Sequence, residues 1–142
     1  MQQNLKELNL AGEPLYIVPE REIEGFDHFG PGISLGHAGA KTLDALCRTL
    51  GVRSISSFYS QDTDALRGHL RYEGYSLPDL PAVTWFSAGA GLKTVRALAE
   101  YLESEPDALD DAKTAIEELR EYETVLERFE KEGIRWYMSA GF

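Results

Sequence analysis

Residues 107–142, DALDDAKTAIEELREYETVLERFEKEGIRWYMSAGF, decide the fold of this chain. Their apolar residues first recur at the three- and four-residue spacing of one helix face: Leu109, Ala112, Ile116, Leu119, Tyr122, Leu126 and Phe129. This spacing predicts a helix over about residues 107–132, roughly 39 Å long at 1.5 Å per residue, which Gly133 ends. Ile134, Trp136 and Met138 then alternate with more polar residues, which is typical of a half-buried strand.

A second strand is predicted at residues 15–18, LYIV, because this run favours β-structure and Pro19 follows it. Antiparallel pairing of this strand with the C-terminal strand would provide each with a partner and a face that helices can cover. The expected fold class is therefore α+β, mostly helical, on a small antiparallel sheet that joins the N- and C-terminal strands.

Three shorter helices are expected beside the long acidic one, making four in all. The first covers about residues 38–50, with Ser34 or Gly39 near its start and Gly51 as its end. The glycine-rich segment before it, residues 20–36, is expected to be an irregular loop, and Ser34 is the candidate helix cap. The second covers about residues 63–72 after Asp62. The third carries an apolar face that ends before Ser104: Leu92, Val95, Leu98, Ala99 and Leu102. Between the first two, the composition of residues 52–60 would suit a strand, but the spacing of Ile55, Phe58 and Tyr59 favours a single helical turn.

Length and composition bound the class of protein. The chain has 142 residues, 43% hydrophobic and 27% charged, which is the balance of one ordinary globular domain, so residues 1–142 are expected to form a single unit. No apolar run approaches the length of a membrane span, and the N-terminus lacks the pattern of a secretion signal. Cys47 is the one cysteine, which excludes an internal disulfide. These features predict a cytoplasmic protein that does not bind membranes.

The net charge of −10 is concentrated in one segment. Residues 100–133 hold thirteen acidic and four basic side chains, which is nine of the ten net negative charges. Such a segment repels nucleic acid, and the chain has no basic cluster, so no nucleic-acid binding is expected. A basic protein is the partner that this charge favours, with Glu117, Glu118 and Glu121 as the candidate docking residues. The function this predicts is a non-enzymatic inhibitor, immunity-type or adaptor protein.

Two catalytic motifs are matched only in part. Residues 32–36 fit Gly-x-Ser-x-Gly, but no strand precedes Ser34 as the nucleophile turn of an α/β-hydrolase requires. Lys93 and Thr94 follow glycines near a helix start, yet their spacing does not fit a phosphate-binding loop. No catalytic residue and no cofactor are predicted.

The alternative function is a small-molecule or metal site formed by the glycine-rich loops of residues 25–37 and 84–96. Glycines allow a backbone to approach a ligand closely, and these loops contain Asp27, His28, His37, Lys93 and Arg96. No histidine spacing pre-arranges a metal site, so no metal ligand is assigned.

A further alternative is a homodimer instead of a monomer. In it the long helix would pack on a second copy, with Tyr101, Tyr122 or Val125 as the candidate contacts.

Residues 84–142 also resemble a family of small acidic bacterial proteins. The resemblance rests on Trp85-Phe86, on Gly91, on Thr94-Val95-Arg96 and on Arg135-Trp136, and it covers roughly 40% of the chain. It implies a bacterial source and carries over no activity and no site residue.

Overall fold

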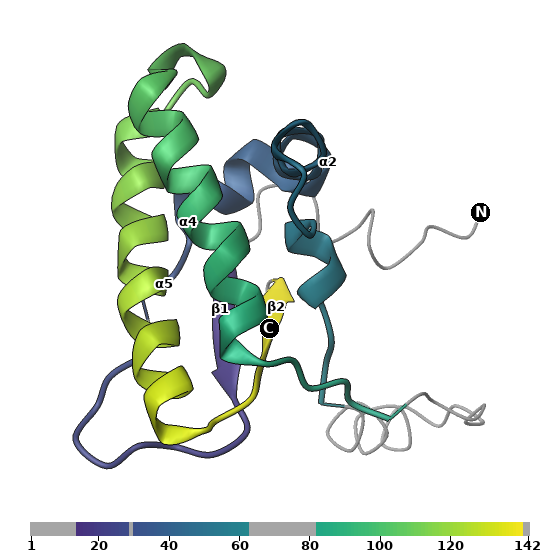
Figure 1. Cartoon of the computed structure of the whole chain (residues 1–142), viewed down its shortest axis with the longest axis vertical. Coiled ribbons are helices and arrows are strands. Elements are labelled where there is room, and N and C mark those ends of the chain that lie inside the picture. The colour runs from purple at the N-terminus through teal and green to yellow at the C-terminus, as the bar shows by residue number, and fades with distance from the viewer. Residues whose placement is uncertain (1–13, 29, 63–81, 141–142) are drawn as a thin grey trace, which may run out of the picture.

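The computed structural model describes residues 14–28, 30–62 and 82–140. Within these ranges the chain forms three α-helices, two strands and two short 3-10 helices (Figure 1). The elements in chain order are β1 (Leu15–Pro19), α2 (Ile33–Leu50), η1 (Ile55–Phe58), α4 (Ala88–Ser104), η2 (Pro106–Ala108), α5 (Ala112–Glu132) and β2 (Trp136–Ala140). Helices α4 and α5 form an antiparallel hairpin, and α2 and the two strands lie against it (Figure 1).

The predicted sheet between the two ends of the chain is confirmed. β1 and β2 pair antiparallel, with Ile17 opposite Met138 and Pro19 opposite Trp136. Ile17, Met138 and Trp136 are buried, as the alternation in the sequence predicts. Tyr137 and Ser139 on the opposite face are buried as well, so β2 is not the half-buried strand expected from the sequence. The free edge of β2 has further backbone partners, because Phe86 exchanges two hydrogen bonds with Trp136 and the Ser60 N–H donates to the Met138 carbonyl. β2 is therefore the central strand of this small layer.

The long helix begins later than the sequence predicts. η2 covers Pro106–Ala108, Leu109 has extended backbone angles (φ −133°, ψ 147°), and α5 starts at Ala112. The predicted single helix over residues 107–132 is thus a short 3-10 turn, a bend and a helix of 21 residues. Gly133 ends α5 in the left-handed region (φ 70°), as expected.

The first helix, in contrast, begins earlier. α2 starts at Ile33, inside the segment expected to be irregular, and bends at Gly39, whose φ of 83° lies outside the helical region. Figure 1 shows the two parts of α2 running in different directions. Gly32 occupies the N-cap position and Ser34 lies within the first turn, so the prediction of Ser34 as the cap is wrong.

The described ranges contain three α-helices rather than the four predicted, and the helix expected at about residues 63–72 lies outside them. The predicted helical turn after Arg53 is confirmed as η1. In the described parts of the chain, no helix has both the length and the apolar character that crossing a membrane requires.

The core centres on Trp136, which is fully buried. Its ring stacks on Phe58 with 5.0 Å between centroids, and its indole N–H donates to the Ser87 carbonyl at 3.0 Å. Tyr122 and Val125 are also buried within the chain, so the homodimer contact that used these two side chains of the long helix is wrong.

Candidate functional site

Glu118, one of the three predicted docking residues, forms its hydrogen bonds within the chain. Its two carboxylate oxygens accept hydrogen bonds from the backbone N–H groups of Ser34 and Leu35, both at 2.9 Å. The first N–H groups of a helix have no partner within the helix, and a carboxylate also interacts favourably with the helix dipole there. Glu118 therefore caps α2 from a helix that lies more than 80 residues away in the sequence.

Asp111 extends this attachment of α5 to the start of α2. The Ser34 hydroxyl donates to Asp111 Oδ2 at 2.7 Å. That hydrogen bond, followed by those from Thr114, lowers the pKa of the Asp111 carboxyl. About three turns further along α5, the buried Tyr122 hydroxyl donates to the Leu15 carbonyl of β1. The N-terminal part of α2 is thus held in a fixed position on α5.

Glu117 and Glu121 remain exposed on α5. Among the described residues neither carboxylate takes part in an ion pair. Glu121 lies against the backbone of Gly30, where a Cβ would overlap its carboxylate. Two of the three predicted docking residues are therefore available to a partner, whereas the third is not.

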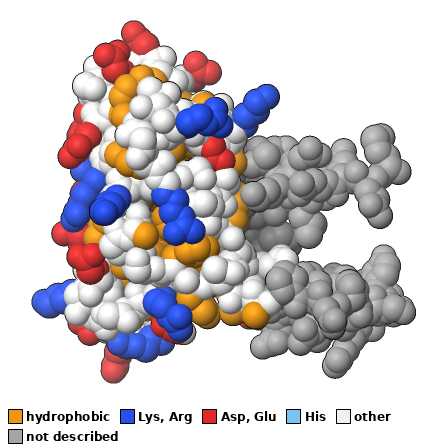
Figure 2. All heavy atoms as spheres, turned by 45° about the vertical axis from the view of Figure 1, so that its right-hand side comes forward, with side chains coloured by type: hydrophobic (Ala, Val, Ile, Leu, Met, Phe, Trp, Pro, Cys, Tyr) orange, Lys and Arg blue, Asp and Glu red, His pale blue; other side chains and the backbone are white. Residues whose placement is uncertain are grey.

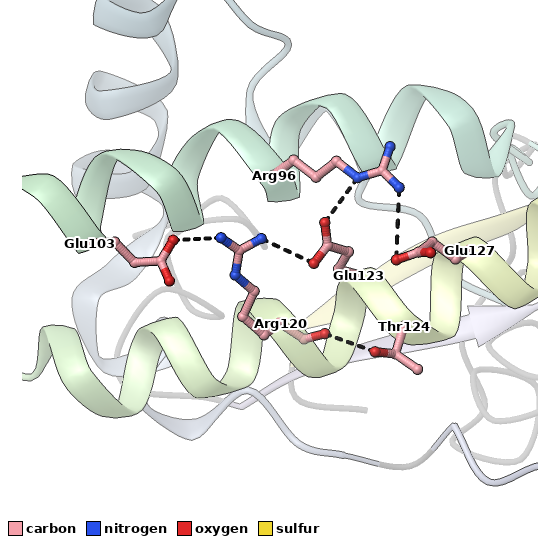
Figure 3. Close-up of polar contacts among 6 residues, drawn as sticks. All are labelled: Arg96, Glu103, Arg120, Glu123, Thr124 and Glu127. Atoms are coloured by element: carbon pink, nitrogen blue, oxygen red, sulfur yellow. Dashed lines mark hydrogen bonds and ion pairs between the residues drawn. The ribbon is translucent and has the colours of Figure 1, made fainter.

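The basic residues of the helical hairpin neutralise a different part of its surface (Figure 3). Arg96 donates to Glu123 at 2.9 Å, and Arg120 donates to the same carboxylate at 3.0 Å and pairs with Glu103. Burial acts to raise the pKa of Glu123, but the hydrogen bonds from the two arginines outweigh it and the pKa is lowered. Arg96 also lies 3.7 Å from Glu127. These arginines connect α4 to α5, and at the upper end of the hairpin they pair, among the described residues, with Glu103 alone.

That upper end, the connection over residues 103–111, carries five carboxylates and no basic side chain. Glu103 pairs with Arg120 and Asp111 with Ser34, whereas Glu105, Asp107 and Asp110 are exposed. Figure 2 shows acidic side chains at this end of the molecule, with hydrophobic side chains among them. We call residues 103–111 the acidic tip.

A hollow of about 550 Å³ lies between the acidic tip and the first part of α2. We call it the α2–α5 hollow. Its walls include apolar and ionisable side chains: Ile33, His37, Ala38, Leu109, Asp110 and Asp111. Ile33 is 51% exposed although it is a large apolar residue. Together with Ala38 and Leu109, the exposed Ile33 gives this hollow an apolar lining.

Ser34, His37 and Asp111 all line this hollow, which raises the question of a catalytic triad. The Ser34 hydroxyl donates to Asp111 and not to a histidine, and the lowered pKa of Asp111 makes that carboxylate a weak base. In a nucleophile turn the N–H after the serine stabilises the oxyanion, but here the Leu35 N–H is bonded to Glu118. These hydrogen bonds attach the start of α2 to α5 and do not activate the Ser34 hydroxyl as a nucleophile.

The lone cysteine is also unsuited to nucleophilic chemistry. Cys47 is fully buried in the core, and burial is the main cause that raises the pKa of its thiol to about 11. The thiolate is the reactive form, and at neutral pH this thiol is protonated.

A second hollow of about 630 Å³ lies at the start of α4. Arg53, Lys93 and Arg96 line it together with Glu130, whose carboxylate lies beside Gly89. The guanidinium of Arg53 stacks over Phe58 and Phe86, 4.6 and 4.7 Å from the ring centroids. Lys93 and Arg96 of the predicted pocket therefore do lie together.

The other residues of that predicted pocket lie elsewhere. His37 lines the α2–α5 hollow, and Asp27 is exposed and lines neither hollow. His28 is buried, with its Nε2 2.7 Å from Glu22 and its ring against Phe129. Neither of these two hollows is lined by residues of both glycine-rich loops. Across the described ranges, no three His, Cys, Asp or Glu side chains are grouped so as to hold a metal ion.

Sequence reasoning missed the α2–α5 hollow and the role of Ile33. Ile33 lies in a glycine-rich segment that has no helical periodicity, and Leu109 matches the buried face of the long helix. No local signal indicates that the chain bends after η2 and leaves a gap beside α2.

Comparison with known proteins yields no relative: the chain matches no family model, no curated protein and no solved structure. The resemblance of residues 84–142 to small acidic bacterial proteins stays a prediction.

Proposed function

We propose that this chain is a non-catalytic binding domain of the inhibitor, immunity or adaptor type, which docks a basic protein on its acidic surface. The observation that carries the proposal is the gathering of unpaired carboxylates on one part of the surface. Among the exposed carboxylates without an ion pair in the described ranges, five lie on the acidic tip and on the part of α5 that follows it: Glu105, Asp107, Asp110, Glu117 and Glu121.

Unpaired surface carboxylates of one sign suit this role for a physical reason. Gathered like charges produce a field that attracts a basic partner and raises its rate of association by roughly 10- to 1,000-fold. They contribute little to the stability of the chain itself, because like charges that lie close together repel. The alternative of a small-molecule pocket shared by the two glycine-rich loops is less well supported, since its residues line separate hollows.

The test compares wild-type protein with Glu117→Lys plus Glu121→Lys. Glu118 is left intact, because its loss would remove the cap of α2 and confuse folding with binding. The matched control is Glu24→Lys plus Glu100→Lys, which changes the net charge equally at two exposed residues that belong neither to the acidic tip nor to α5. Each protein is immobilised and exposed to native lysate at low and moderate salt, and the retained proteins are identified by mass spectrometry.

We expect a basic protein to be retained by the wild type and the control and lost from the α5 variant. Its rate of association, measured afterwards with the purified partner, should fall roughly tenfold in the α5 variant and decrease steeply with added salt. Equal retention by both variants, or binding that is insensitive to ionic strength, would show the proposal to be wrong.

A further inference from the structure

The α2–α5 hollow combines two properties that are rarely found together on a surface without a partner. Ile33, Ala38 and Leu109 provide an apolar lining, and Ile33 is half exposed to solvent. Asp110 also lines the hollow, and Asp107 directly precedes the lining residue Ala108 in the chain. Apolar surface surrounded by charge is typical of an interaction site.

The walls of this hollow are pre-organised. Glu118 and Asp111 hold Ser34 and Leu35 on α5, and Gly39 turns the remainder of α2 away from this attached segment. Ile33 and His37 are therefore presented from a short helical segment whose position is fixed. A rigid wall lowers the cost of binding, because less conformational freedom is lost when the partner arrives.

The charge around the hollow selects between possible occupants. The acidic tip carries five carboxylates, of which Glu105, Asp107 and Asp110 have no ion pair among the described residues. Basic residues adjoin the lining of the hollow at two places in the chain: Lys41 precedes Thr42, and Lys113 follows two residues after Asp111. A second copy of this chain, with its net charge of −10, would bring negative charge against a negative rim. A segment with basic side chains around an apolar one would instead match both the rim and the lining.

We infer that the α2–α5 hollow receives large apolar side chains from a basic amphipathic segment of the partner protein. This inference rests on the proposed function and assigns its apolar anchor point. A volume of about 550 Å³ lies within the usual range of ligand sites, roughly 300–1,000 Å³. The unpaired carboxylates bring the segment to the surface, and the contact with Ile33 holds it there.

The experiment uses three fluorescein-labelled peptides of fourteen residues. The first has leucine at helical spacing and lysine elsewhere, the second has alanine in place of each leucine, and the third has glutamate in place of each lysine. Their affinities are measured by fluorescence anisotropy against the full chain and against Ile33→Ser, Ile33→Leu and Glu117→Lys plus Glu121→Lys. Circular dichroism melting checks that each variant folds, which the partial exposure of Ile33 favours.

We expect the leucine–lysine peptide to bind the wild type and Ile33→Leu alike and to bind Ile33→Ser about tenfold more weakly, because apolar contact area is lost. The alanine–lysine peptide should be insensitive to Ile33→Ser. Amide chemical shifts in a titration should change most near Ile33, His37 and Leu109.

Several results would overturn the inference. If Ile33→Ser leaves the affinity unchanged while the glutamate reversals weaken it, the hollow is not the anchor and the acidic docking surface stands. If neither basic peptide responds to any variant, both proposals are wrong. Tighter binding of the leucine–glutamate peptide would exclude a basic occupant. Self-association that Ile33→Ser abolishes, measured by light scattering, would assign the hollow to a second copy.

Discussion

At the scale of the residue, two adjacent carboxylates on α5 have different roles. Glu117 and Glu118 follow one another in the chain, but successive residues of a helix are rotated by about 100°. Glu118 therefore faces α2 and accepts two backbone hydrogen bonds, whereas Glu117 faces solvent. The same residue type thus contributes to stability at one position and to surface charge at the next.

Alanine substitution should separate these two roles. Glu118→Ala leaves two N–H groups of α2 without their acceptor, and we expect the free energy of unfolding to fall by about 1–2 kcal/mol. Glu117→Ala, in the same helix, should change it by less than about 0.5 kcal/mol. Urea unfolding at pH 7 measures both. An equal effect of the two substitutions would show that the capping interaction does not contribute to stability.

The carboxylate of Glu123 predicts a dependence of stability on pH. Because the folded state lowers its pKa below the ordinary value of 4.5, this group stabilises the fold above that pH and ceases to do so as the pH falls through the folded pKa. Glu123→Gln should therefore destabilise the chain by up to about 1 kcal/mol at pH 7, and the difference from the wild type should shrink below about pH 4.

Urea unfolding at several pH values between about 7 and 2.5 tests this expectation, because the range must extend below the lowered pKa of Glu123. Glu100→Gln serves as the control, since Glu100 is exposed and has no ion pair among the described residues. A difference between Glu123→Gln and the wild type that stays constant over this range would contradict the assignment.

At the scale of the element, the close contact between α4 and the neighbouring layer depends on a glycine. Gly91 lies in α4 where a Cβ would overlap the Trp136 ring and lie 3.1 Å from Leu126 Cδ1. Glycine is intrinsically unfavourable within a helix by about 1 kcal/mol relative to alanine. The contact with a rigid buried ring outweighs that preference, so packing between elements determines the residue at this position.

Gly91→Ala should accordingly lower stability even though it favours the helix. Overpacking of a filled core costs roughly 1–3 kcal/mol, which exceeds the gain in helix propensity. Gly89→Ala in the first turn of α4 is the matched control, because a Cβ there approaches only the end of the Glu130 side chain. Thermal melting of both variants measures the change in stability. A higher melting temperature for Gly91→Ala would show that α4 and β2 are not packed closely enough to exclude a Cβ at this position.

At the scale of the whole molecule, β2 connects nearly every part of the fold. It pairs with β1, exchanges backbone hydrogen bonds with the segment before α4, and accepts one from Ser60 after η1. Trp136 also packs on Phe58 and contacts Gly91 and Ser87. A strand near the C-terminus thus brings together segments from the beginning, middle and end of the described chain.

Loss of Trp136 should therefore affect the entire domain. We expect Trp136→Ala to cost roughly 3–5 kcal/mol, a large part of the 5–15 kcal/mol typical of a domain's stability. Trp85→Ala is the control, because Trp85 is half-buried and its ring contacts Tyr137 with 5.2 Å between centroids. Its effect should be clearly smaller, and similar losses for the two tryptophans in urea unfolding would contradict a central role for Trp136.

The periodicity of the sequence was sufficient to predict the α+β class, the pairing of the terminal strands and the left-handed glycines that end α2 and α5. These features depend on the order of residues within a short segment, where apolar spacing and glycine conformation act directly. For the same reason, the surplus of negative charge over residues 100–133 is readable without a structure.

Only the tertiary structure decided which carboxylates are free, where α2 begins, and that Ile33 stands beside a hollow. Glu118 meets the start of α2 across more than 80 residues, and Leu109 and Ile33 come together because the chain bends between η2 and α5. Such contacts depend on how the helices pack in three dimensions, which local spacing does not specify. The composition thus determined the acidity of this protein, and the packing of α5 on α2 determined which part of that acidity a partner can reach.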